Sequence, residues 1–468
     1  MAHSPMKSYH LFVTDEQPMT KHNSTRSIAA IVLAAGMGTR MKSDLPKVMH
    51  KIAGRPMITH VLSSVGELSP DLVVVVVGPH MDSVRQTVKP AITAVQEKPL
   101  GTGHAIASAL EDLKDFGGDV LILFGADPLI RPDTMQRLLD TLKNGVVVAV
   151  LGFCPDDPGA YGRLIVTGDG KLSAIVEARD ATPEQLQIPI CNSGVMAVNG
   201  ALLPELIKLI KNDNAKGEYY LTDIVGLAQG AGHKCAWIEG DADELIGVDS
   251  RADLAQAEAI VQNRFRKRAM DNGATLIAPE TVFFSHDTTL GHDVVVEPNV
   301  VFGAGVKIND SVTVHSFSHI EGATIDQGAT IGPYARLRPG ADVGENAKIG
   351  NFVEIKNARL DAGAKVSHLS YIGDAYIGVD ANIGAGTITC NYDGFSKSKT
   401  TIGAGAFIGS NTALVAPVTV GDRAIIGAGS VIAKNVDIDA LAVTRAPQKS
   451  VHGWAEKFRK KQTLKKKD

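Results

Sequence analysis

Apolar residues recur every six positions through the second half of the chain. A period of six fits neither an α-helix, which repeats every 3.6 residues, nor a half-buried strand, which repeats every two. It is typical of a parallel β-helix, in which three hexapeptides form one coil and stacked coils bury columns of small side chains. The apolar positions form three series: Ile331, Leu337, Val343, Ile349, Ile355; Leu360, Val366, Ile372; and Ile402, Ile408, Leu414, Val420, Ile426, Ile432.

Two features of composition fit this repeat. The chain holds 47 glycines, and aromatic residues make up only 5% of it. A β-helix packs small aliphatic side chains in place of aromatic ones, and glycine suits its tight corners. We therefore predict a β-helix over residues 273–447, left-handed and associated as a homotrimer like many folds with this repeat. Glycine follows the repeated apolar residue at Gly332, Gly344, Gly350, Gly373, Gly403, Gly409, Gly421 and Gly427.

The repeat is interrupted once and then ends. The interruption, Cys390–Lys399, is too long and too polar for a corner, and extruded loops on solenoids often carry function. The period stops at Ala446-Pro447, and residues 448–468 follow as a basic tail. We predict that this tail is a solvated, disordered end, with binding of an anionic ligand as the alternative.

The first half alternates strand-like apolar runs with amphipathic helical stretches. This pattern predicts an α/β, Rossmann-like domain over residues 28–248, with a parallel sheet that binds ligands at its strand ends. Residues 249–272 start with capping residues and predict a linking helix, and residues 1–27 predict a disordered extension. The expected strands are Ile28–Leu33, Leu72–Val77, Val120–Phe124 and Val146–Leu151, and the expected helices are Met57–Gly66, His104–Leu113 and Pro132–Lys143.

Charge, hydropathy and cysteine content exclude several classes of protein. The net charge of −4 argues against a nucleic-acid partner. The longest apolar run, Asp71–Gly78, is too short to span a membrane. The four cysteines lie far apart without a CxxC pair, which argues against a zinc site or a disulfide framework. They fit a reducing compartment, so we expect a cytoplasmic protein.

The turn after the first strand suits phosphate groups. Residues 33–40 read Leu-Ala-Ala-Gly-Met-Gly-Thr-Arg, and Lys47 follows in Leu-Pro-Lys. The two glycines let the backbone close on a phosphate chain, and Arg40 adds a positive fork. A structural turn with solvent-facing cations is the alternative. The string resembles the signature of sugar-phosphate nucleotidyltransferases, which implies that Arg40 and Lys47 are catalytic through charge neutralisation at the phosphates.

Further strings narrow the resemblance. Gln96 with residues 100–104 is similar to a base-recognition segment, and residues 161–163, 177 and 191–194 are similar to sugar-pocket motifs. With its hexapeptide half, the chain resembles the bacterial bifunctional UDP-N-acetylglucosamine pyrophosphorylases / glucosamine-1-phosphate N-acetyltransferases. The resemblance implies that nucleotide and sugar are bound by Leu33, Ala34, Ala35, Gly36, Lys47, Gln96, Gly101, Thr102, Phe124, Gly125, Gly162, Glu177, Asn192 and Asp249.

The resemblance implies two reactions on small-molecule substrates. The second half would transfer acetyl from acetyl-CoA to glucosamine-1-phosphate. In the first half, the phosphate of N-acetylglucosamine-1-phosphate would then attack the α-phosphorus of UTP and release pyrophosphate, with Mg²⁺ as cofactor. The product, UDP-N-acetylglucosamine, would supply precursors of peptidoglycan and lipopolysaccharide.

Two departures from the family concern the metal. The family has Gly-Asp-x-Pro after a strand, whereas this chain has Phe124-Gly-Ala-Asp-Pro128, which moves the carboxylate one residue on. Adjacent side chains of an extended chain point to opposite sides, so Asp127 would need a local backbone change to reach the metal. Asp249 stands where the family usually has Asn. We predict that Asp127 and Asp249 hold Mg²⁺; a weakened or absent metal site is the alternative.

The second half resembles the acetyltransferase domain motif by motif. The expected general base is His368, because a histidine can take a proton from the attacking amine near neutral pH. A corner histidine, with Arg338 and Lys356 as surface cations, is the structural alternative. The resemblance places the acceptor sugar at Arg338, Lys356, Tyr371 and Asn382, and acetyl-CoA at Ala385, Asn391, Tyr392, Ser410, Ala428 and Arg445.

Three other functions stay open. Ala126 could leave an acetyltransferase whose N-terminal domain only binds nucleotide. A non-enzymatic scaffold is disfavoured by the intact Arg40, Lys47 and His368. A pyrophosphorylase for glucose-1-phosphate with a purely structural β-helix would not need the strings around His368 and Asn391.

Overall fold

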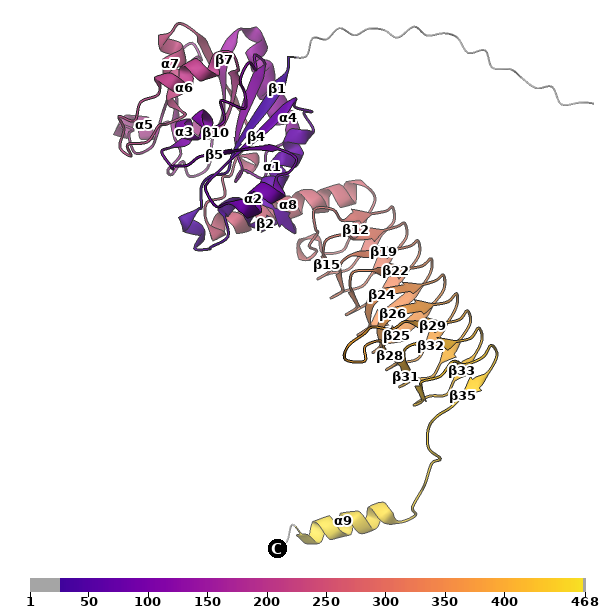
Figure 1. Cartoon of the computed structure of the whole chain (residues 1–468). Helices are drawn as coiled ribbons and strands as arrows, with labels where there is room; N and C mark the ends of the chain where they lie inside the picture. The colour runs from indigo at the N-terminus through magenta and orange to yellow at the C-terminus, as the bar shows by residue number, and fades with distance from the viewer. Residues whose placement is uncertain (1–25, 466–468) are drawn as a thin grey trace, which may run out of the picture.

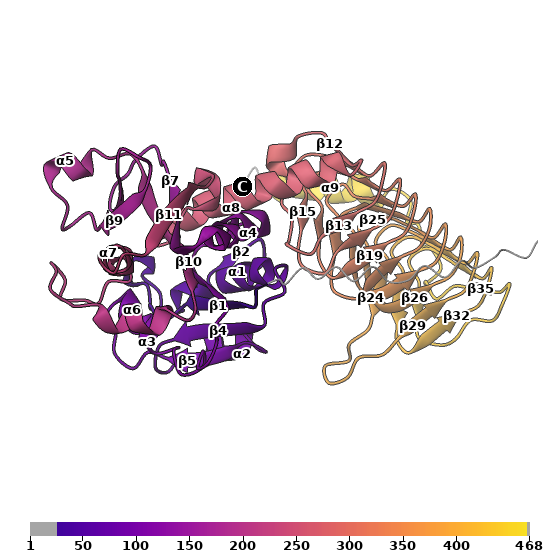
Figure 2. The ribbon, with the colours of Figure 1, turned by 90° about the horizontal axis from the view of Figure 1, so that it is seen from above.

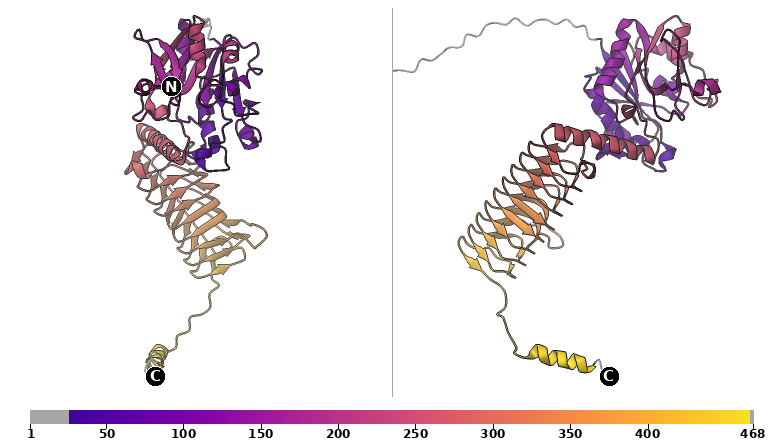
Figure 3. Two further views of the ribbon diagram at one scale, coloured as in Figure 1. Left: turned by 90° about the vertical axis from the view of Figure 1, so that its left-hand side faces the viewer. Right: turned by 180° about the vertical axis from the view of Figure 1, so that it is seen from behind.

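The computed structural model describes residues 26–465, which form two bodies joined by one long helix (Figure 1). The first half lies at one end, the second half forms an elongated solenoid, and helix α8 (Arg251–Asp271) runs across between them (Figures 1 and 3). The predicted capping at the start of α8 is confirmed, since Ser250 and Asp253 form a capping box. Of the predicted N-terminal extension, only Arg26 and Ser27 lie among the described residues.

The first half is built on a sheet whose main path runs β11-β7-β10-β6-β1-β4-β5. Its strands are β1 (Ile28–Leu33), β4 (Leu72–Val77), β5 (Ile92–Val95), β6 (Asp119–Phe124), β7 (Val146–Phe153), β8 (Arg163–Val166), β9 (Leu172–Val176), β10 (Cys191–Asn199) and β11 (Lys234–Glu239). The helices are α1 (Met57–Gly66), α2 (Asp82–Thr87), α3 (Thr102–Ala107), α4 (Pro132–Thr141), α5 (Pro183–Leu186), α6 (Leu203–Leu209) and α7 (Asp223–Gly230).

The four predicted strands are confirmed, and α1 and α4 lie where the sequence predicts helices. The predicted parallel sheet has one exception on its main path, because β10 runs antiparallel to both β6 and β7. A parallel connection needs a long crossover, usually a helix, whereas the β8–β9 hairpin and the single turn α5 lie between β7 and β10. Helix α3 is also shorter than predicted, because tight turns replace it beyond Ala107.

A short hairpin of the first half, β2 (Lys51–Ile52) and β3 (Arg55–Pro56), contacts both α8 and the solenoid. At its tip the Ala53 amide donates to Glu258 Oε2 of α8 at 2.8 Å. The Ala53 carbonyl accepts a hydrogen bond of 2.9 Å from the His286 amide of the solenoid. Ala53 therefore links the α/β domain to both the linking helix and the first coil, where the three parts lie next to one another (Figure 2).

The second half is a parallel β-helix with three columns of strands. The first column is β12 (Thr275–Leu276), β14 (Val295–Val296), β17 (Thr313–Val314), β20 (Thr330–Ile331), β23 (Lys348–Asn351), β25 (Lys365–His368), β27 (Asn382–Ile383), β30 (Phe407–Ile408), β33 (Ile425–Ile426) and β35 (Leu441–Ala442). The second is β13 (Thr289–Leu290), β16 (Lys307–Ile308), β19 (Ala323–Ile325), β22 (Ala341–Val343), β24 (Glu354–Leu360), β26 (Tyr371–Ile377), β29 (Thr400–Ile402) and β32 (Val418–Val420). The third is β15 (Val301–Phe302), β18 (His319–Ile320), β21 (Arg336–Leu337), β24 and β26 again, β28 (Ile388–Cys390), β31 (Ala413–Val415) and β34 (Val431–Ile432).

The six-residue repeat is the core of this solenoid. Every apolar residue of the three predicted series is at most 3% exposed. The repeat glycines, however, are needed mainly for space between coils. A Cβ on Gly350 would lie 1.9 Å from the Ser367 carbonyl oxygen, and one on Gly409 would lie 2.4 Å from the Ala428 amide nitrogen. Among these eight glycines only Gly332 has a positive φ.

The extruded loop and the tail differ in how well they were predicted. The loop is confirmed: Thr313 pairs with Thr330 and Thr330 with Lys348, 17 and 18 residues apart, whereas Asn382 pairs with Phe407 across the loop. The tail prediction is wrong, because helix α9 (Trp454–Lys465) forms within it. Residues with high helix propensity and an i,i+4 pair between Glu456 and Lys460 favour the helix. Helix α9 lies apart from the solenoid (Figure 3).

Candidate functional site

The turn after β1 leaves space beside its backbone. A Cβ on Gly36 would have no heavy atom within 4 Å. Gly38 has a positive φ of 73°, and its Cβ would lie 2.6 Å from the Cβ of Lys47. The two glycines therefore act differently: Gly38 lets Lys47 pack against the turn, and Gly36 leaves backbone open to a ligand.

The predicted base-recognition segment is held by a second part of the chain. Gln96 is buried, and its Nε2 donates to the Gly101 carbonyl at 3.1 Å. Gly101 has a φ of 110°, and a Cβ there would lie 2.6 Å from the Tyr219 carbonyl oxygen. Thr102 Oγ1 accepts a hydrogen bond of 2.9 Å from the Leu221 amide. The segment and residues 217–223 thus form one unit.

A cleft of about 910 Å³ opens beside this unit. It is lined by Glu177, whose carboxylate accepts a hydrogen bond of 3.1 Å from Thr222 Oγ1. Burial raises the pKa of Glu177. Asn192 lies next to Gly162, since its backbone N–H donates to the Gly162 carbonyl at 2.8 Å. The predicted sugar-pocket residues are therefore neighbours in space, although they come from separate strands.

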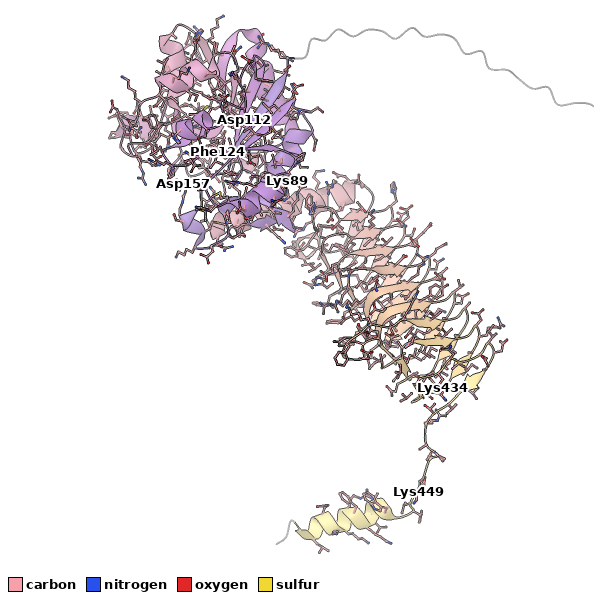
Figure 4. All side chains as sticks on the ribbon, in the orientation of Figure 1. Lys89, Asp112, Phe124, Asp157, Lys434 and Lys449 are labelled. Atoms are coloured by element: carbon pink, nitrogen blue, oxygen red, sulfur yellow. The ribbon has the colours of Figure 1, made fainter. Side chains whose placement is uncertain are left out.

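The strand ends bring the remaining predicted residues of the first half together. Leu33 and Phe124 are register partners at the ends of β1 and β6, and the Gly125 amide donates to the Leu33 carbonyl at 2.9 Å. Ala34 and Ala35 continue β1 into the glycine turn. Phe124 lies inside the domain, whereas Asp157 belongs to the lining of the cleft (Figure 4).

Three charged groups meet at one end of the cleft. Asp249 Oδ1 lies 2.7 Å from Lys47 Nζ, and Asp249 Oδ2 lies 3.0 Å from Arg40 Nη2. Burial alone would raise the pKa of Asp249, but the two cations outweigh it and lower that pKa below its usual range. We call these three residues the ion triad.

Asp127 has the backbone change that the sequence requires of it. The chain turns at Gly125 and Ala126, and the Asp127 amide donates back to the Phe124 carbonyl at 3.2 Å. Ala126 packs its methyl group into the core. Burial raises the pKa of Asp127 to about 7; Lys47 opposes this shift, and the nearby Asp249 adds to it.

Asp127 and Asp249 together suit Mg²⁺. Magnesium is commonly bound through one or two carboxylates together with substrate phosphates and water. In the described part of the chain, no group of three or more His, Cys, Asp or Glu side chains is arranged to hold a metal. The other ligands would therefore be phosphate oxygens and water.

In the second half, the predicted base and part of the predicted acetyl-CoA site lie on one corner line. The backbone carbonyls of these residues accept hydrogen bonds from backbone amides of the next coil. His368 accepts from Gly386 at 3.3 Å, Ala385 from Asn411 at 2.7 Å, and Ser410 from Gly429 at 2.8 Å. Ala428 follows Ser410 on this line, and its carbonyl accepts a hydrogen bond of 2.6 Å from Arg445. The solenoid thus aligns residues that are 60 positions apart in the sequence.

His368 is held in a defined orientation on this line. Its Nδ1 lies 2.6 Å from Oδ1 of Asn351, the paired residue of the previous coil. An amide oxygen can only accept, so Nδ1 carries the proton and Nε2 keeps its lone pair. His368 is exposed, so this lone pair is available to a substrate.

The predicted phosphate cations lie on the adjoining face. Arg338 and Lys356 occupy the same position in successive coils, and Arg338 pairs with Glu354 at 2.8 Å. Lys397, from the extruded loop, lies beside Lys356 and lowers the pKa of its ammonium, and Arg338 adds to this effect. Tyr371 lies over Gly373 on the same face, and Asn382 lies on the neighbouring column.

The extruded loop is anchored at its base. Asn391 is buried and donates to the carboxylate of Asp374, and its carbonyl accepts from the Ser398 amide at 2.9 Å. Tyr392 is 60% exposed and pairs with Lys397 across the loop. The ring of Tyr392 is therefore open to solvent, while its hydroxyl donates to the Gly394 carbonyl of the same loop.

Comparison with known proteins agrees with this architecture. Residues 30–182 match the family of MobA-like NTP transferase domains, and residues 322–357 and 399–434 match the bacterial transferase hexapeptide. A bifunctional protein GlmU from Paramagnetospirillum magneticum is 58% identical over 445 residues, covering 95% of this chain and 99% of that protein. One from Rhodospirillum rubrum is 60% identical over 433 residues, covering 92% and 97%.

The chain belongs to the bifunctional GlmU family. Its membership confirms the Rossmann-like domain followed by a left-handed β-helix. It also confirms the predicted bifunctional enzyme, a UDP-N-acetylglucosamine pyrophosphorylase and glucosamine-1-phosphate N-acetyltransferase. None of the helices in residues 26–465 is long and apolar enough to cross a membrane.

Three residues of this GlmU-family chain were missed at the sequence level. Asn351 could have been found, because it lies one coil before His368 in the repeat. Lys397 lies in the extruded loop, but only the fold brings it close to Lys356. Tyr220 lines the cleft with a buried hydroxyl that has no hydrogen-bond partner among the described residues, and nothing in its local sequence indicates that orientation.

Proposed function

We propose that the cleft of the first half carries uridylyl transfer through the residues described above. Gln96, Gly101 and Thr102 bind the uracil, and Glu177 and Asn192 bind the sugar. Arg40 and Lys47 neutralise the phosphates while the sugar phosphate attacks the α-phosphorus and pyrophosphate leaves. Arg40, Glu177 and Tyr220 line one cleft, and Gln96, Gly101 and Thr102 are hydrogen-bonded into the segment that contains Tyr220, an arrangement that carries this proposal.

Mg²⁺ is proposed as the cofactor of this transfer. Asp127 and Asp249 would hold it, and the ion would neutralise charge that develops on the phosphates. The turn at Gly125 and Ala126 supports this assignment, since Asp127 lies close enough for Lys47 and Asp249 to shift its pKa.

For the second half we propose acetyl transfer from acetyl-CoA with His368 as general base. The amine of glucosamine-1-phosphate gives its proton to Nε2 as its nitrogen attacks the thioester carbonyl, and CoA leaves as the thiol. Arg338 and Lys356 hold the sugar phosphate. Ala385, Ser410 and Ala428 supply the corner line for acetyl-CoA, with Asn391, Tyr392 and Arg445 at its sides.

We also propose a cytoplasmic homotrimer. An exposed aromatic ladder supports association: Phe317, Tyr334 and Phe352 stack at 4.9 and 5.2 Å on the corner beside the His368 line. Each is about half exposed, and an exposed apolar row of this kind favours a protein interface. A neighbouring subunit on this ladder would border the acetyl-transfer site.

Separate assays of the two half-reactions test the proposal. His368→Ala should abolish acetyl transfer and leave uridylyl transfer near its normal rate. Lys47→Ala should do the reverse. Acetyl transfer that survives His368→Ala removes this residue from its role. A wild-type chain that acetylates but never uridylylates, with Mg²⁺ present, supports the alternative of an acetyltransferase alone.

A further inference from the structure

The ion triad ties up the two cations that uridylyl transfer needs. Asp249 contacts Lys47 and Arg40 through separate oxygens, at 2.7 and 3.0 Å. Among the described residues, no other carboxylate lies within 4.0 Å of either cation. A nucleotide phosphate must therefore compete with the Asp249 carboxylate for both positive groups.

The triad is built into the fold from both sides. The Asp249 amide donates to Asp253 Oδ2 at 3.0 Å, which fixes it at the start of α8. Lys47 packs directly against Gly38, because a Cβ at position 38 would overlap the Lys47 side chain. The Lys47 side chain is 20% exposed and that of Asp249 is 39% exposed, so their attraction is less screened than that of a surface pair.

We infer that Asp249 couples metal binding to nucleotide binding in this enzyme. The inference rests on the proposed uridylyl transfer. A carboxylate that ligates a divalent cation has its charge balanced there, so it no longer holds Lys47 and Arg40. Both cations then face the phosphates. By linkage, bound nucleotide strengthens metal binding by the same factor.

The carboxylate is what makes this coupling possible. An asparagine at position 249 would keep an oxygen ligand for the metal but lose the negative charge. An amide oxygen could still accept hydrogen bonds from Lys47 and Arg40, but the Coulomb attraction of a full negative charge would be lost. An amide would therefore hold the two cations less tightly whether or not a metal is bound, and the nucleotide would gain less from the metal.

Calorimetric titration of UTP into the full chain tests the inference. Affinity is measured in EDTA and in MnCl₂ for the wild type, Asp249→Asn and Asp156→Asn. Asp156 lines the same cleft and pairs with neither cation, so its variant removes the same charge without disturbing the triad or the Asp253 contact that holds it. We expect Asp249→Asn to bind UTP about 10-fold more tightly in EDTA. The ratio of the UTP affinity in MnCl₂ to that in EDTA should fall by a similar factor, whereas Asp156→Asn should keep the wild-type ratio.

A second variant tests the coupling from the metal side. Arg40→Gln frees one oxygen of Asp249, so Mn²⁺ binding without nucleotide, followed by electron paramagnetic resonance, should tighten several-fold. Equal affinity ratios in Asp249→Asn and Asp156→Asn, or unchanged Mn²⁺ binding in Arg40→Gln, overturn the inference alone. A wild-type chain that binds no UTP even with Mn²⁺ overturns the proposed uridylyl transfer as well.

Discussion

The Nδ1 atom of His368 lies 2.6 Å from Oδ1 of Asn351, one coil earlier in the solenoid. This contact fixes the tautomer that leaves Nε2 free to accept a proton. Replacing Asn351 with Ala should lower kcat for acetyl transfer roughly 10-fold, a part of the effect of a general base. The KM for acetyl-CoA and the rate of uridylyl transfer should stay unchanged. An Asn351→Ala enzyme with the wild-type kcat for acetyl transfer would exclude this positioning role.

Lys397 is expected to bind the phosphate of the acetyl acceptor. Its ammonium lies beside that of Lys356, and the two positive charges repel each other. Among the described ion pairs, Lys356 has no acidic partner, whereas Arg338 pairs with Glu354. Lys397→Ala should raise the KM for glucosamine-1-phosphate about 10-fold, as expected for the loss of one charged hydrogen bond. Lys399→Ala is the matched control, because Lys399 lies over the Tyr376 ring. Equal KM values in the two variants would contradict this role.

Gly36 should be required for nucleotide binding but not for folding. A Cβ there meets no protein atom, so it would enter the space left for phosphate. Gly36→Ala should keep the wild-type melting temperature and raise the KM for UTP roughly 10-fold, in line with the cost of a steric overlap. Gly66→Ala, at a position equally free of neighbours and at the end of α1, should leave the KM for UTP unchanged. A Gly36→Ala enzyme with normal KM would contradict the phosphate assignment.

The stability of the first half should fall in acid because of His60. Burial lowers the pKa of His60 to about 4 from 6.5, and nearby Arg55 and His286 contribute. The unfolded chain therefore binds this proton between pH 6.5 and 4 while the folded domain does not. The free energy of unfolding then falls as the pH drops through this window, by roughly 2 kcal/mol at pH 5.

Calorimetric melting at pH 7.5 and 5.0 measures this dependence. His60→Gln keeps a donor for the Ile52 carbonyl, which His60 Nε2 contacts at 2.9 Å, but has no proton to gain. Its melting temperature should fall less between the two pH values than that of the wild type. His80→Gln, at an exposed position, should behave like the wild type, and an equal drop in all three proteins would exclude His60 as the cause.

The aromatic ladder should hold subunits together. Phe352 is the ring nearest the His368 corner, and truncation of a central aromatic contact commonly costs an interface about 2 kcal/mol or more. Phe352→Ser should sediment as a smaller species at micromolar concentration and lose acetyl transfer while keeping uridylyl transfer. Leu209→Ser, an exposed apolar position on α6, is the control. A Phe352→Ser protein of unchanged size would place the interface elsewhere.

The solenoid could be predicted closely because its sequence signal and its packing have the same period. Each apolar residue of the series fills the core. The burial of Ile402 or Ile426 could therefore be predicted without knowing which distant residues lie next to it. The antiparallel β10 could not be predicted in this way. Its direction depends on how the chain returns through the β8–β9 hairpin, which local periodicity does not record.

In the candidate site, too, local features could be predicted from the sequence and long-range contacts could not. Residues within one motif, such as Gly36 and Arg40, could be assigned from their spacing. The ion triad could not, because Asp249 reaches Lys47 across 202 positions of sequence. The turn that redirects Asp127 also depends on Ala126 finding room in the core, which is a property of the packed domain.

Helix α8 has a consequence for the order of events in the cell. At about 1.5 Å per residue, its 21 residues extend about 31 Å from the ion triad to the start of the solenoid, and His368 lies several coils beyond. With the sites as proposed above, we expect a sugar phosphate acetylated at the solenoid to enter bulk solution before the cleft takes it up. There it would mix with molecules made by other copies of the enzyme. Fusing the two activities in one chain would then fix their stoichiometry without channelling the intermediate.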